Sequence, residues 1–444
     1  MGVAKRLDSP DCRGFDLGQA VAEAGRCLLC HEAPCSKACP AQTDPGAFIR
    51  KLRFRNLTGA ARTIKKNNVL GGACGILCPT ARLCEKECSA TGIDRPIRIG
   101  RLQRFLVEHA WKTGFNPLEK PETRRKEKVA VVGSGPAGLA CAAHLARLGF
   151  PVTVFEARPE PGGVLRYGVP EFRLPKEFLQ RELDDIRALG VVFRCGSPVR
   201  GKGAAEALLK KGFKAVFLAP GLWAPMRLNS RKAAGVFSSV DFLAAQREGR
   251  KGPLENALRG KPCAVIGGGS VAIDCARSAL RLGASDVYLL YRRSFAQMPA
   301  EEDERLEALQ EGVHFLVLNQ PVEYLCDPKG ALTGIRLRKT RLGRPDGSGR
   351  RKPEEVPGTD WTLEVRAVIE AIGNKAPEGS SQAYPSVAVR PDGLIRAGEK
   401  DGRTSKAGIY AGGDIVRGPD LVVRAVSDGK AAAKAIAAQL GVRA

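Results

Sequence analysis

The density of cysteine near the start of the chain is the strongest constraint on how it folds. Eight of the fourteen cysteines lie between residues 27 and 88. They form two runs, Cys27-x2-Cys30-x4-Cys35-x3-Cys39-Pro40 and Cys74-x3-Cys78-x5-Cys84-x3-Cys88. Iron–sulfur clusters need several thiolates from tight loops, and a ferredoxin-type run sends its last cysteine, beside a proline, to the other cluster. The two runs therefore predict two metal clusters.

Zinc binding and disulfide formation are the competing uses of these cysteines. Structural zinc favours CxxC pairs, and the second run has CxxxC spacing and no CxxC. Disulfides need an oxidising compartment, and the first 25 residues contain no apolar stretch of signal-peptide length. We favour iron–sulfur clusters and keep the other two as alternatives.

Composition limits the remaining function classes. A chain of 444 residues with 43% hydrophobic content can bury two or three cores. No apolar stretch is long enough for a membrane helix, so we expect a cytoplasmic protein that does not bind membranes. The net charge of +24 is spread along the chain without interleaved aromatic residues, so we expect no nucleic-acid partner. Acidic partners and phosphorylated cofactors would benefit from this charge.

A dinucleotide-binding fingerprint follows a charged linker at residues 116–128. Residues 128–132 predict a strand, Gly133-Ser-Gly135-Pro-Ala-Gly138 a tight turn, and residues 139–148 a helix. The next strand, residues 152–155, ends at Glu156. Glycines allow close approach to a pyrophosphate, the helix N-terminus faces it, and the acid binds the ribose hydroxyls. This unit predicts an FAD site.

A second unit of the same kind starts at residue 262. Strands at 262–266 and 287–290 flank the turn Gly267-Gly-Gly269-Ser-Val-Ala272 and a helix at 273–282. Arg292 and Arg293 stand where the acid of an NAD site would be. Guanidinium groups suit a 2'-phosphate, so we predict NADPH, with NADH as the alternative. Two solvent-facing arginines after a strand are the other explanation.

The C-terminal region contains a third candidate element. A strand runs into Gly413-Asp414, and the following helix can point its N-terminus at a flavin ring. Asp414 alone could equally be a helix N-cap. Together with the first fingerprint, it predicts the closure of the flavin site.

These features resemble the flavoproteins that join two dinucleotide folds to an N-terminal iron–sulfur domain. The glutamate synthase small subunit and the N-terminal region of dihydropyrimidine dehydrogenase are examples. The likeness covers essentially all 444 residues, and NAD(P)H-oxidising subunits of bacterial dihydropyrimidine dehydrogenase match best. Residues 74–84 and 97–105 look more like dihydropyrimidine dehydrogenase, whereas residues 417–423 look more like glutamate synthase.

The resemblance implies specific ligands. One cluster takes Cys27, Cys30, Cys35 and Cys88, and the other takes Cys39, Cys78, Cys84 and Gln103. Cys74 would be a spectator, although the residues alone would favour it over Gln103. The implied FAD residues are Gly133, Ser134, Gly135, Pro136, Ala137, Glu156, Gly162, Gly163, Arg173, Gly413 and Asp414. The implied nicotinamide-nucleotide residues are Gly268, Gly269, Ser270, Val271, Arg292, Arg293, Ala371, Ile372 and Gly373.

The predicted fold class is α/β. An N-terminal all-α iron–sulfur domain precedes two Rossmann-like dinucleotide-binding domains, the second inserted in the first. We expect a helical domain with two 4Fe-4S clusters at residues 1–115. The FAD-binding domain would comprise residues 116–224 and 376–444, and the NAD(P)H-binding domain would lie between these segments, at residues 225–375.

The expected function follows from these domains. A nicotinamide gives up two electrons as a hydride and a cluster accepts one, so FAD must lie between them. This chemistry needs orientation and a dry contact, so no catalytic side chain is assigned. Disulfide reduction would need a CxxC near the flavin, and none follows residue 88.

The chain ends about thirty residues after Asp414, which leaves no room for a final substrate domain. We therefore expect a hetero-oligomer in which this chain supplies electrons to a catalytic subunit containing FMN and iron–sulfur clusters. That subunit would reduce uracil or thymine. The alternatives are a glutamate synthase small subunit, an electron-bifurcating or sulfide-linked reductase, and a nucleic-acid binder with structural clusters.

Overall fold

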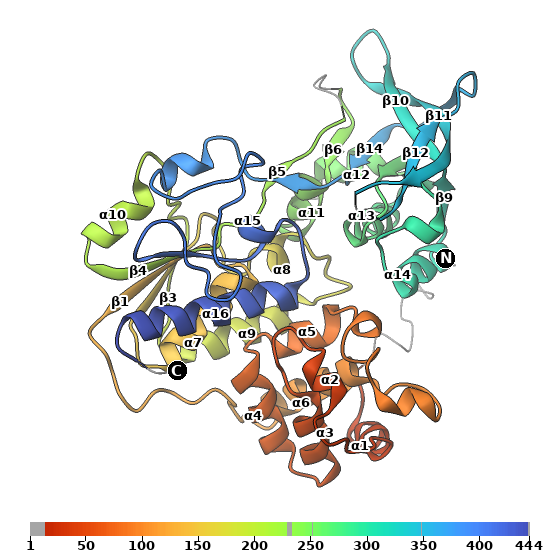
Figure 1. Cartoon of the computed structure of the whole chain (residues 1–444). Helices are drawn as coiled ribbons and strands as arrows, with labels where there is room; N and C mark the ends of the chain where they lie inside the picture. The colour runs from red at the N-terminus through yellow and green to blue at the C-terminus, as the bar shows by residue number, and fades with distance from the viewer. Residues whose placement is uncertain (1–13, 229–232, 251, 348, 443–444) are drawn as a thin grey trace. The chain divides into compact units, whose positions relative to one another are not determined.

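The computed structural model describes residues 14–228, 233–250, 252–347 and 349–442 (Figure 1). The chain forms two compact units. The smaller unit consists of residues 225–374 together with 167–170. The larger unit takes the described residues of 14–166, 171–224 and 375–442. One long segment thus interrupts the larger unit, and the chain afterwards returns to it.

The larger unit begins with a helical region. Its helices are α1 (Leu17–Gly25), α2 (Pro34–Lys37), α3 (Pro45–Arg53), α4 (Leu57–Asn67), α5 (Gly71–Leu77) and α6 (Ile99–Lys112), with short turns η3 (Thr80–Arg82) and η4 (Ser89–Gly92). Asp16 and Gln19 form a capping box at α1, and the Asn56 side chain caps α4. Apolar residues of α3, α4 and α6, including Phe48 and Leu102, form its core. The cysteine-bearing loops lie around this core.

A five-stranded parallel sheet forms the rest of the larger unit, in the order β16-β4-β1-β2-β3. Its strands are β1 (Lys128–Val132), β2 (Val152–Phe155), β3 (Val192–Arg194), β4 (Phe213–Leu218) and β16 (Ile409–Ala411). Its helices are α7 (Pro136–Arg147), α8 (Val164–Tyr167), α9 (Lys176–Ala188), α10 (Ala204–Lys210), η6 (Ser380–Ala383), α15 (Asp414–Arg417) and α16 (Val422–Gln439). Because β16 comes from the C-terminal region and pairs with β4, the predicted insertion of one fold into the other is confirmed.

The smaller unit contains a second parallel sheet, in the order β6-β14-β7-β8-β9. Its strands are β6 (Val236–Ser238), β7 (Cys263–Ile266), β8 (Val287–Tyr291), β9 (Val313–Val317) and β14 (Ala367–Glu370). Its helices are α11 (Ser239–Arg247), α12 (Gly252–Leu258), α13 (Ser270–Arg281), η5 (Phe295–Gln297) and α14 (Glu302–Gln310). The short strands β5 (Ala224–Pro225) and β15 (Asn374–Lys375) pair where the chain enters and leaves.

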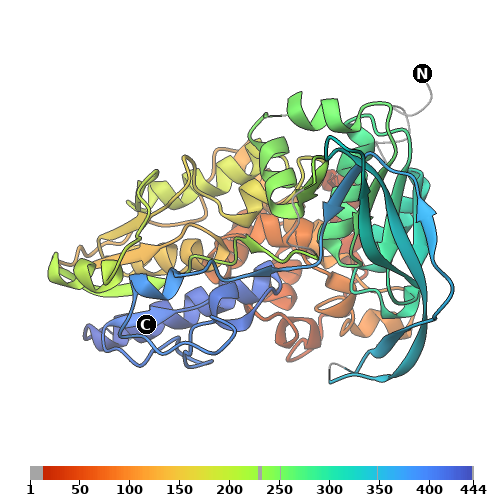
Figure 2. The ribbon, with the colours of Figure 1, turned by 90° about the horizontal axis from the view of Figure 1, so that it is seen from above.

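The smaller unit also contains an antiparallel sheet that the sequence analysis did not predict. Its strands are β10 (Asn319–Cys326), β11 (Leu332–Pro345), β12 (Arg351–Glu355) and β13 (Trp361–Leu363). Figure 2 shows these long strands in teal and blue. Leu332, Ile335 and Leu337 of β11 pack against β7 and β14, which buries one face of the parallel sheet.

A buried ionic network joins the helical region to the flavin-type fold of the same unit. The Lys65 ammonium on α4 lies 3.0 Å from a carboxylate oxygen of Glu182 and 3.0 Å from one of Asp185, both on α9. The Glu182 carboxylate also accepts hydrogen bonds from the backbone N–H groups of Gly72 (2.9 Å) and Ala73 (3.1 Å). These groups open α5, so a residue of α9 caps the helix that carries Cys74 and ends just before Cys78.

Candidate functional site

Four cysteines from distant stretches of the helical region surround one small cavity. Cys27, Cys30, Cys35 and Cys88 all line it, together with apolar neighbours such as Leu28 and Ile49, and we call it the first thiol cavity. All four thiols are free. Burial raises the pKa of Cys27, and it raises the pKa of Cys35 to about 11. Because the thiolate is the ligand form, a bound cation would be needed to hold these thiols ionised at neutral pH.

A second cavity collects the other predicted ligands. Cys39, Cys78, Cys84 and Gln103 line it, and so does Cys74; we call it the second thiol cavity. The buried Gln103 side chain donates from its amide nitrogen to the Gly71 carbonyl oxygen, which leaves the amide oxygen as a donor atom for a metal. The structure brings both Gln103 and Cys74 to this cavity, so both remain candidates for the fourth ligand.

The second thiol cavity holds its sulfurs in a dry environment. A hydrogen bond between the Cys74 and Cys78 thiols, followed by burial, raises the pKa of Cys78. Burial, and then the charge of Glu85, raise the pKa of Cys84. Metal binding would favour the ionised form of Cys78 and Cys84, which burial otherwise disfavours.

The arrangement of donors distinguishes a cluster from a single ion. In the described ranges of the chain, no three histidine, cysteine, aspartate or glutamate side chains converge closely enough to hold one metal ion. Tetrahedral zinc needs all its sulfur ligands within about 2.3 Å of one point. Thiols that surround a cavity suit the larger iron–sulfur cluster better.

The first fingerprint forms the turn between β1 and α7. Gly133 has φ +96°, and a Cβ there would lie 2.2 Å from the Ala219 carbonyl oxygen, so only glycine is tolerated. Ser134, Gly135, Pro136 and Ala137 complete the turn, and Pro136 and Ala137 begin α7. The glycine-rich turn therefore leads directly into the N-terminus of α7, which is the part of this motif that a pyrophosphate would approach.

Glu156 occupies the end of β2, where the ribose-binding acid was expected. Its buried carboxylate accepts hydrogen bonds from the backbone N–H groups of Ser134 (3.0 Å) and Arg158 (2.8 Å), and from the Ser134 hydroxyl. The structure thus places Glu156 directly beside the fingerprint turn.

A second loop closes over the turn. The Gly162 N–H donates to the Ser134 hydroxyl (3.0 Å), and a Cβ at Gly163 would lie 2.6 Å from the Cα of Gly135. Arg173 lies further along, in the partly exposed segment before α9. The structure therefore brings Gly162 and Gly163 to the fingerprint turn.

The C-terminal element meets the fingerprint from the other side. A Cβ at Gly413 would lie 3.0 Å from the Ala137 side chain, and one at Gly429 of α16 would lie 2.2 Å from the Ala137 carbonyl oxygen. Asp414 begins α15, and burial raises its pKa to about 7, with smaller contributions from the charges of Asp420 and Asp428. Figure 1 shows α16 running along α7.

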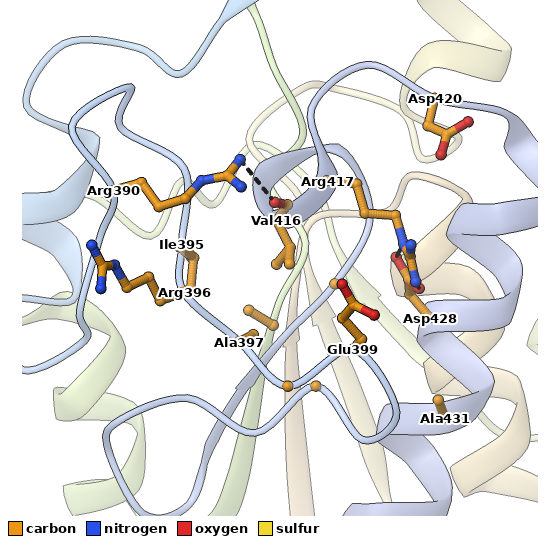
Figure 3. Close-up of a pocket in the computed structure, with 14 residues that line it drawn as sticks. Arg390, Ile395, Arg396, Ala397, Glu399, Val416, Arg417, Asp420, Asp428 and Ala431 are labelled. Atoms are coloured by element: carbon orange, nitrogen blue, oxygen red, sulfur yellow. Dashed lines mark hydrogen bonds and ion pairs between the residues drawn. The ribbon is translucent and has the colours of Figure 1, made fainter. Parts of the chain in front are cut away.

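Two residues that the sequence analysis missed support the Gly413 loop. The Asp428 carboxylate accepts a hydrogen bond from the Gly413 N–H (3.0 Å) and pairs with the Arg417 guanidinium (2.7 Å). This pair forms one wall of a cavity of about 380 Å³ (Figure 3). Arg390 reaches the Val416 carbonyl oxygen across the same cavity (3.3 Å). None of the predicted cofactor residues lines this cavity.

The second fingerprint connects β7 to α13 in the smaller unit. A Cβ at Gly268 would lie 2.5 Å from the Tyr291 ring, and Gly269 precedes α13. Ser270 and the exposed Val271 open this helix. Ala371, Ile372 and Gly373 follow the neighbouring strand β14, and the Ala371 N–H bonds to the Ile266 carbonyl oxygen (2.8 Å). The predicted nucleotide residues thus meet at the carboxyl ends of β7 and β14.

The two arginines after β8 have different environments. Arg292 is exposed, and no ion pair engages its side chain within the stretches of chain that the structure describes. Arg293 is buried, pairs with Asp346 (2.6 Å) and donates to the Arg351 carbonyl oxygen (2.9 Å). Arg292 is therefore available to a nucleotide phosphate, while Arg293 holds the antiparallel sheet to β8.

A cysteine-rich helical region joined to two dinucleotide-binding folds defines an NAD(P)-dependent iron–sulfur flavoprotein oxidoreductase. Residues 8–115 match the family described as dihydropyrimidine dehydrogenase domain II, 4Fe-4S cluster, and residues 127–429 match pyridine nucleotide-disulphide oxidoreductase. The chain belongs to the family that contains the NAD-dependent dihydropyrimidine dehydrogenase subunit PreT and the glutamate synthase small chain.

Individual relatives show how much of the chain is shared. The PreT subunit of Salmonella typhimurium is 38% identical over 95% of this chain and 95% of its own length. The NADPH glutamate synthase small chain of Escherichia coli is 35% identical over 95% of this chain and 92% of its own. The fold resembles Mycobacterium tuberculosis FprA, solved with NADPH, with a TM-score of 0.59, 20% identity, and coverage of 71% of this chain and 85% of that one. Among the described residues, no helix is long and apolar enough to cross a membrane.

Proposed function

We propose that this chain is the electron-input subunit of a larger cytoplasmic oxidoreductase. FAD would bind the first dinucleotide fold, NADPH or NADH the second, and a 4Fe-4S cluster each thiol cavity. FAD links a two-electron hydride donor to one-electron clusters. A partner subunit containing FMN and iron–sulfur clusters would receive the electrons and reduce uracil or thymine to the dihydropyrimidine.

The observation that carries this proposal is the position of α16. Gly429 of α16 packs on Ala137 of the FAD fingerprint, and Val423 near its N-terminus lines the second thiol cavity. One helix therefore borders both a candidate flavin site and a candidate cluster site. The chain's residues bind, orient and shield these groups, and no acid–base residue is required of them.

The first thiol cavity supports the proposed exit to a partner. Leu28 lies between Cys27 and Cys30, lines this cavity, and is 46% exposed. Exposed apolar side chains beside a functional group are typical of protein interaction sites. The names of the relatives, a subunit and a small chain, also support assembly with a catalytic partner.

Anaerobic purification tests the cofactor assignment. We expect FAD together with about eight iron and eight sulfide per chain, the content of two 4Fe-4S clusters. The isolated chain should oxidise NADPH with artificial acceptors but leave pyrimidines and dihydropyrimidines unchanged. Stoichiometric zinc without acid-labile sulfide, or pyrimidine turnover by the isolated chain, would contradict the proposal.

A glutamate synthase small chain is the second candidate. The similarity of residues 417–423 and the 35% identity to the Escherichia coli protein favour it. Reconstitution distinguishes the candidates: the chain is mixed with either an FMN- and iron–sulfur-containing pyrimidine subunit or a large amidotransferase subunit. NADPH-dependent activity with only the amidotransferase subunit would replace our proposal with this one.

We assign Gln103, with Cys39, Cys78 and Cys84, to the second cluster, and leave Cys74 as a buried neighbour. Cys74→Ser should then keep the full iron content, whereas Gln103→Leu should lose or alter the paramagnetic signal of one cluster. The reverse pattern would move the assignment to an all-cysteine set.

A further inference from the structure

Lys430 connects the flavin-type fold to the cysteine loops. It lies on α16, and its ammonium donates a hydrogen bond to the Ala41 carbonyl oxygen at 2.5 Å. The buried Ala41 lies between Cys39 and Thr43, and both of these residues line the second thiol cavity. The side chain thus carries a positive charge from α16 to the backbone of a cluster-binding loop.

The surroundings of Lys430 leave this charge uncompensated. The side chain is only partly exposed, and no carboxylate pairs with it among the described residues. The neighbouring charges on α16 and α7 are the cations Lys434 and Arg147, which also act on the nearby His144 and lower its pKa. Burial first, and then these two cations, lower the pKa of Lys430 to about 8, whereas a thiolate at Cys39 acts in the opposite direction.

A partly buried cation without an anion costs free energy unless a negative group is bound nearby. The Ala41 carbonyl that binds Lys430 lies two residues after Cys39, and a cluster bound by three thiolates would spread negative charge over the cavity that Cys39 lines. The net charge near a cluster is one of the factors that set its reduction potential.

We infer that Lys430 supplies the positive charge that raises the reduction potential of the cluster in the second thiol cavity. This inference rests on the proposed function for one point only, the presence of an iron–sulfur cluster there. Its consequence is that the cluster beside the flavin accepts electrons more readily than it would without Lys430. A purely structural role would consist of the hydrogen bond to Ala41 alone.

Three substitutions separate charge from hydrogen bonding. Lys430→Arg keeps the charge, Lys430→Gln keeps a donor but removes the charge, and Lys430→Met removes both. Lys434→Met is the control, because it removes an exposed cation one turn further along the same helix. Cys84→Ser and Cys27→Ser identify which spectral signal belongs to which cavity.

The measurement is a potentiometric titration of the anaerobically purified holoprotein, followed by electron paramagnetic resonance. One unit charge in a partly buried site should change the equilibrium constant for reduction of the second-cavity cluster by about tenfold. This corresponds to about 59 mV for one electron. We expect Lys430→Gln and Lys430→Met to lower the potential by this amount. In Lys430→Arg and Lys434→Met, the equilibrium constant for reduction of this cluster should stay within about twofold of the wild-type value. The potential of the other cluster should not change in any variant.

Several results would overturn the inference. A wild-type potential in Lys430→Gln, with only reduced stability, would show a structural tether. Equal shifts in both clusters, or in Lys434→Met, would show a general effect of surface charge. Absence of the second-cavity signal in the wild-type protein would remove the premise. Normal cluster potentials without NADPH oxidation would instead contradict the proposed function and leave the role of Lys430 intact.

Discussion

Replacing Lys65 by Met tests the buried ionic network that joins α4, α5 and α9. Met has a similar apolar stem and no charge, so Glu182 and Asp185 would lose their shared cation while remaining in place. Lys65 and Glu182 are both 0% exposed. Burial disfavours the ammonium, but the two carboxylates outweigh it and raise the pKa of Lys65. Burial also raises the pKa of Glu182, and the Lys65 ammonium and the α5 backbone N–H groups oppose that rise. The raised pKa of Lys65 together with these hydrogen bonds favours the ion pair.

The expected decrease in the free energy of unfolding of Lys65→Met follows from the contacts of the three charged groups. Removing one partner of a buried ion pair costs about 3–5 kcal/mol, because the other charge remains buried and uncompensated. Glu182 would keep its hydrogen bonds from Gly72 and Ala73, and Asp185 would keep the one from the Trp111 ring nitrogen (3.1 Å). These contacts favour the lower end of the range, about 3 kcal/mol.

The assay is chemical denaturation of the larger unit, combined with hydrogen exchange at the first amides of α5. Lys37→Met is the control, since Lys37 and Glu32 form an exposed pair (2.5 Å, both 66% exposed) that should contribute less than about 1 kcal/mol. The double variant Lys65→Met/Glu182→Leu should be more stable than the sum of the single losses predicts, because it removes Lys65 and Glu182 together and leaves only the Asp185 carboxylate without its cation. A loss below about 1 kcal/mol in Lys65→Met, or strict additivity, would refute the reasoning.

Three further predictions concern single residues. Gly163→Ala should weaken FAD binding at least about tenfold, because its Cβ would meet the fingerprint turn. The control is Gly190→Ala, a glycine that also has positive φ but faces open space. Equal FAD affinities of the two variants in titrations would contradict this prediction. Arg292→Ala should raise the KM for NADPH about 10- to 150-fold and the KM for NADH little. Arg293→Ala should mainly lower stability, because Arg293 pairs with Asp346. Equal effects of Arg292→Ala on the two KM values would argue against a phosphate contact. Burial, and then nearby cations including Lys430, lower the pKa of His144 to about 3, so the stability that its neutral form provides is present above about pH 6.5 and lost as pH falls toward 3. Between about pH 7 and pH 4.5, the free energy of unfolding of His144→Gln should therefore fall by about 2 kcal/mol less than that of the wild type, as measured by denaturant titrations. An unchanged pH slope would oppose this assignment.

The sequence predicted the features of the candidate sites that depend on local geometry. The Gly133 turn needs glycine because of a contact with Ala219, and such turns have a recognisable local pattern. The spacing of the cysteines indicated two clusters, and the resemblance implied which thiols share each one. The four thiols that the resemblance assigns to one cluster line the first thiol cavity. The residues alone favoured Cys74 and the resemblance favoured Gln103, and the fold brings both to the same cavity.

Contacts between distant residues were beyond the reach of sequence patterns. Arg293 pairs with Asp346, which lies in the unexpected antiparallel sheet. Nothing local to β8 distinguishes the buried Arg293 from the exposed Arg292. Lys65 and Glu182 are similarly far apart in the chain, and neither belongs to a motif. Such pairs become visible only when the tertiary structure is known.

The pairing of β16 with β4 has a consequence for how the protein folds during translation. Ile409 pairs with Val216, so the flavin-type sheet lacks strand β16 until residues 409–411 have been synthesised, long after β4. During translation β4 would present an unpaired edge, which is prone to wrong association. The interrupting segment, by contrast, contains all five strands of its own parallel sheet and can fold as soon as it leaves the ribosome. We therefore expect the nucleotide-binding unit to form first, and truncations before residue 409 to aggregate through the open edge of β4.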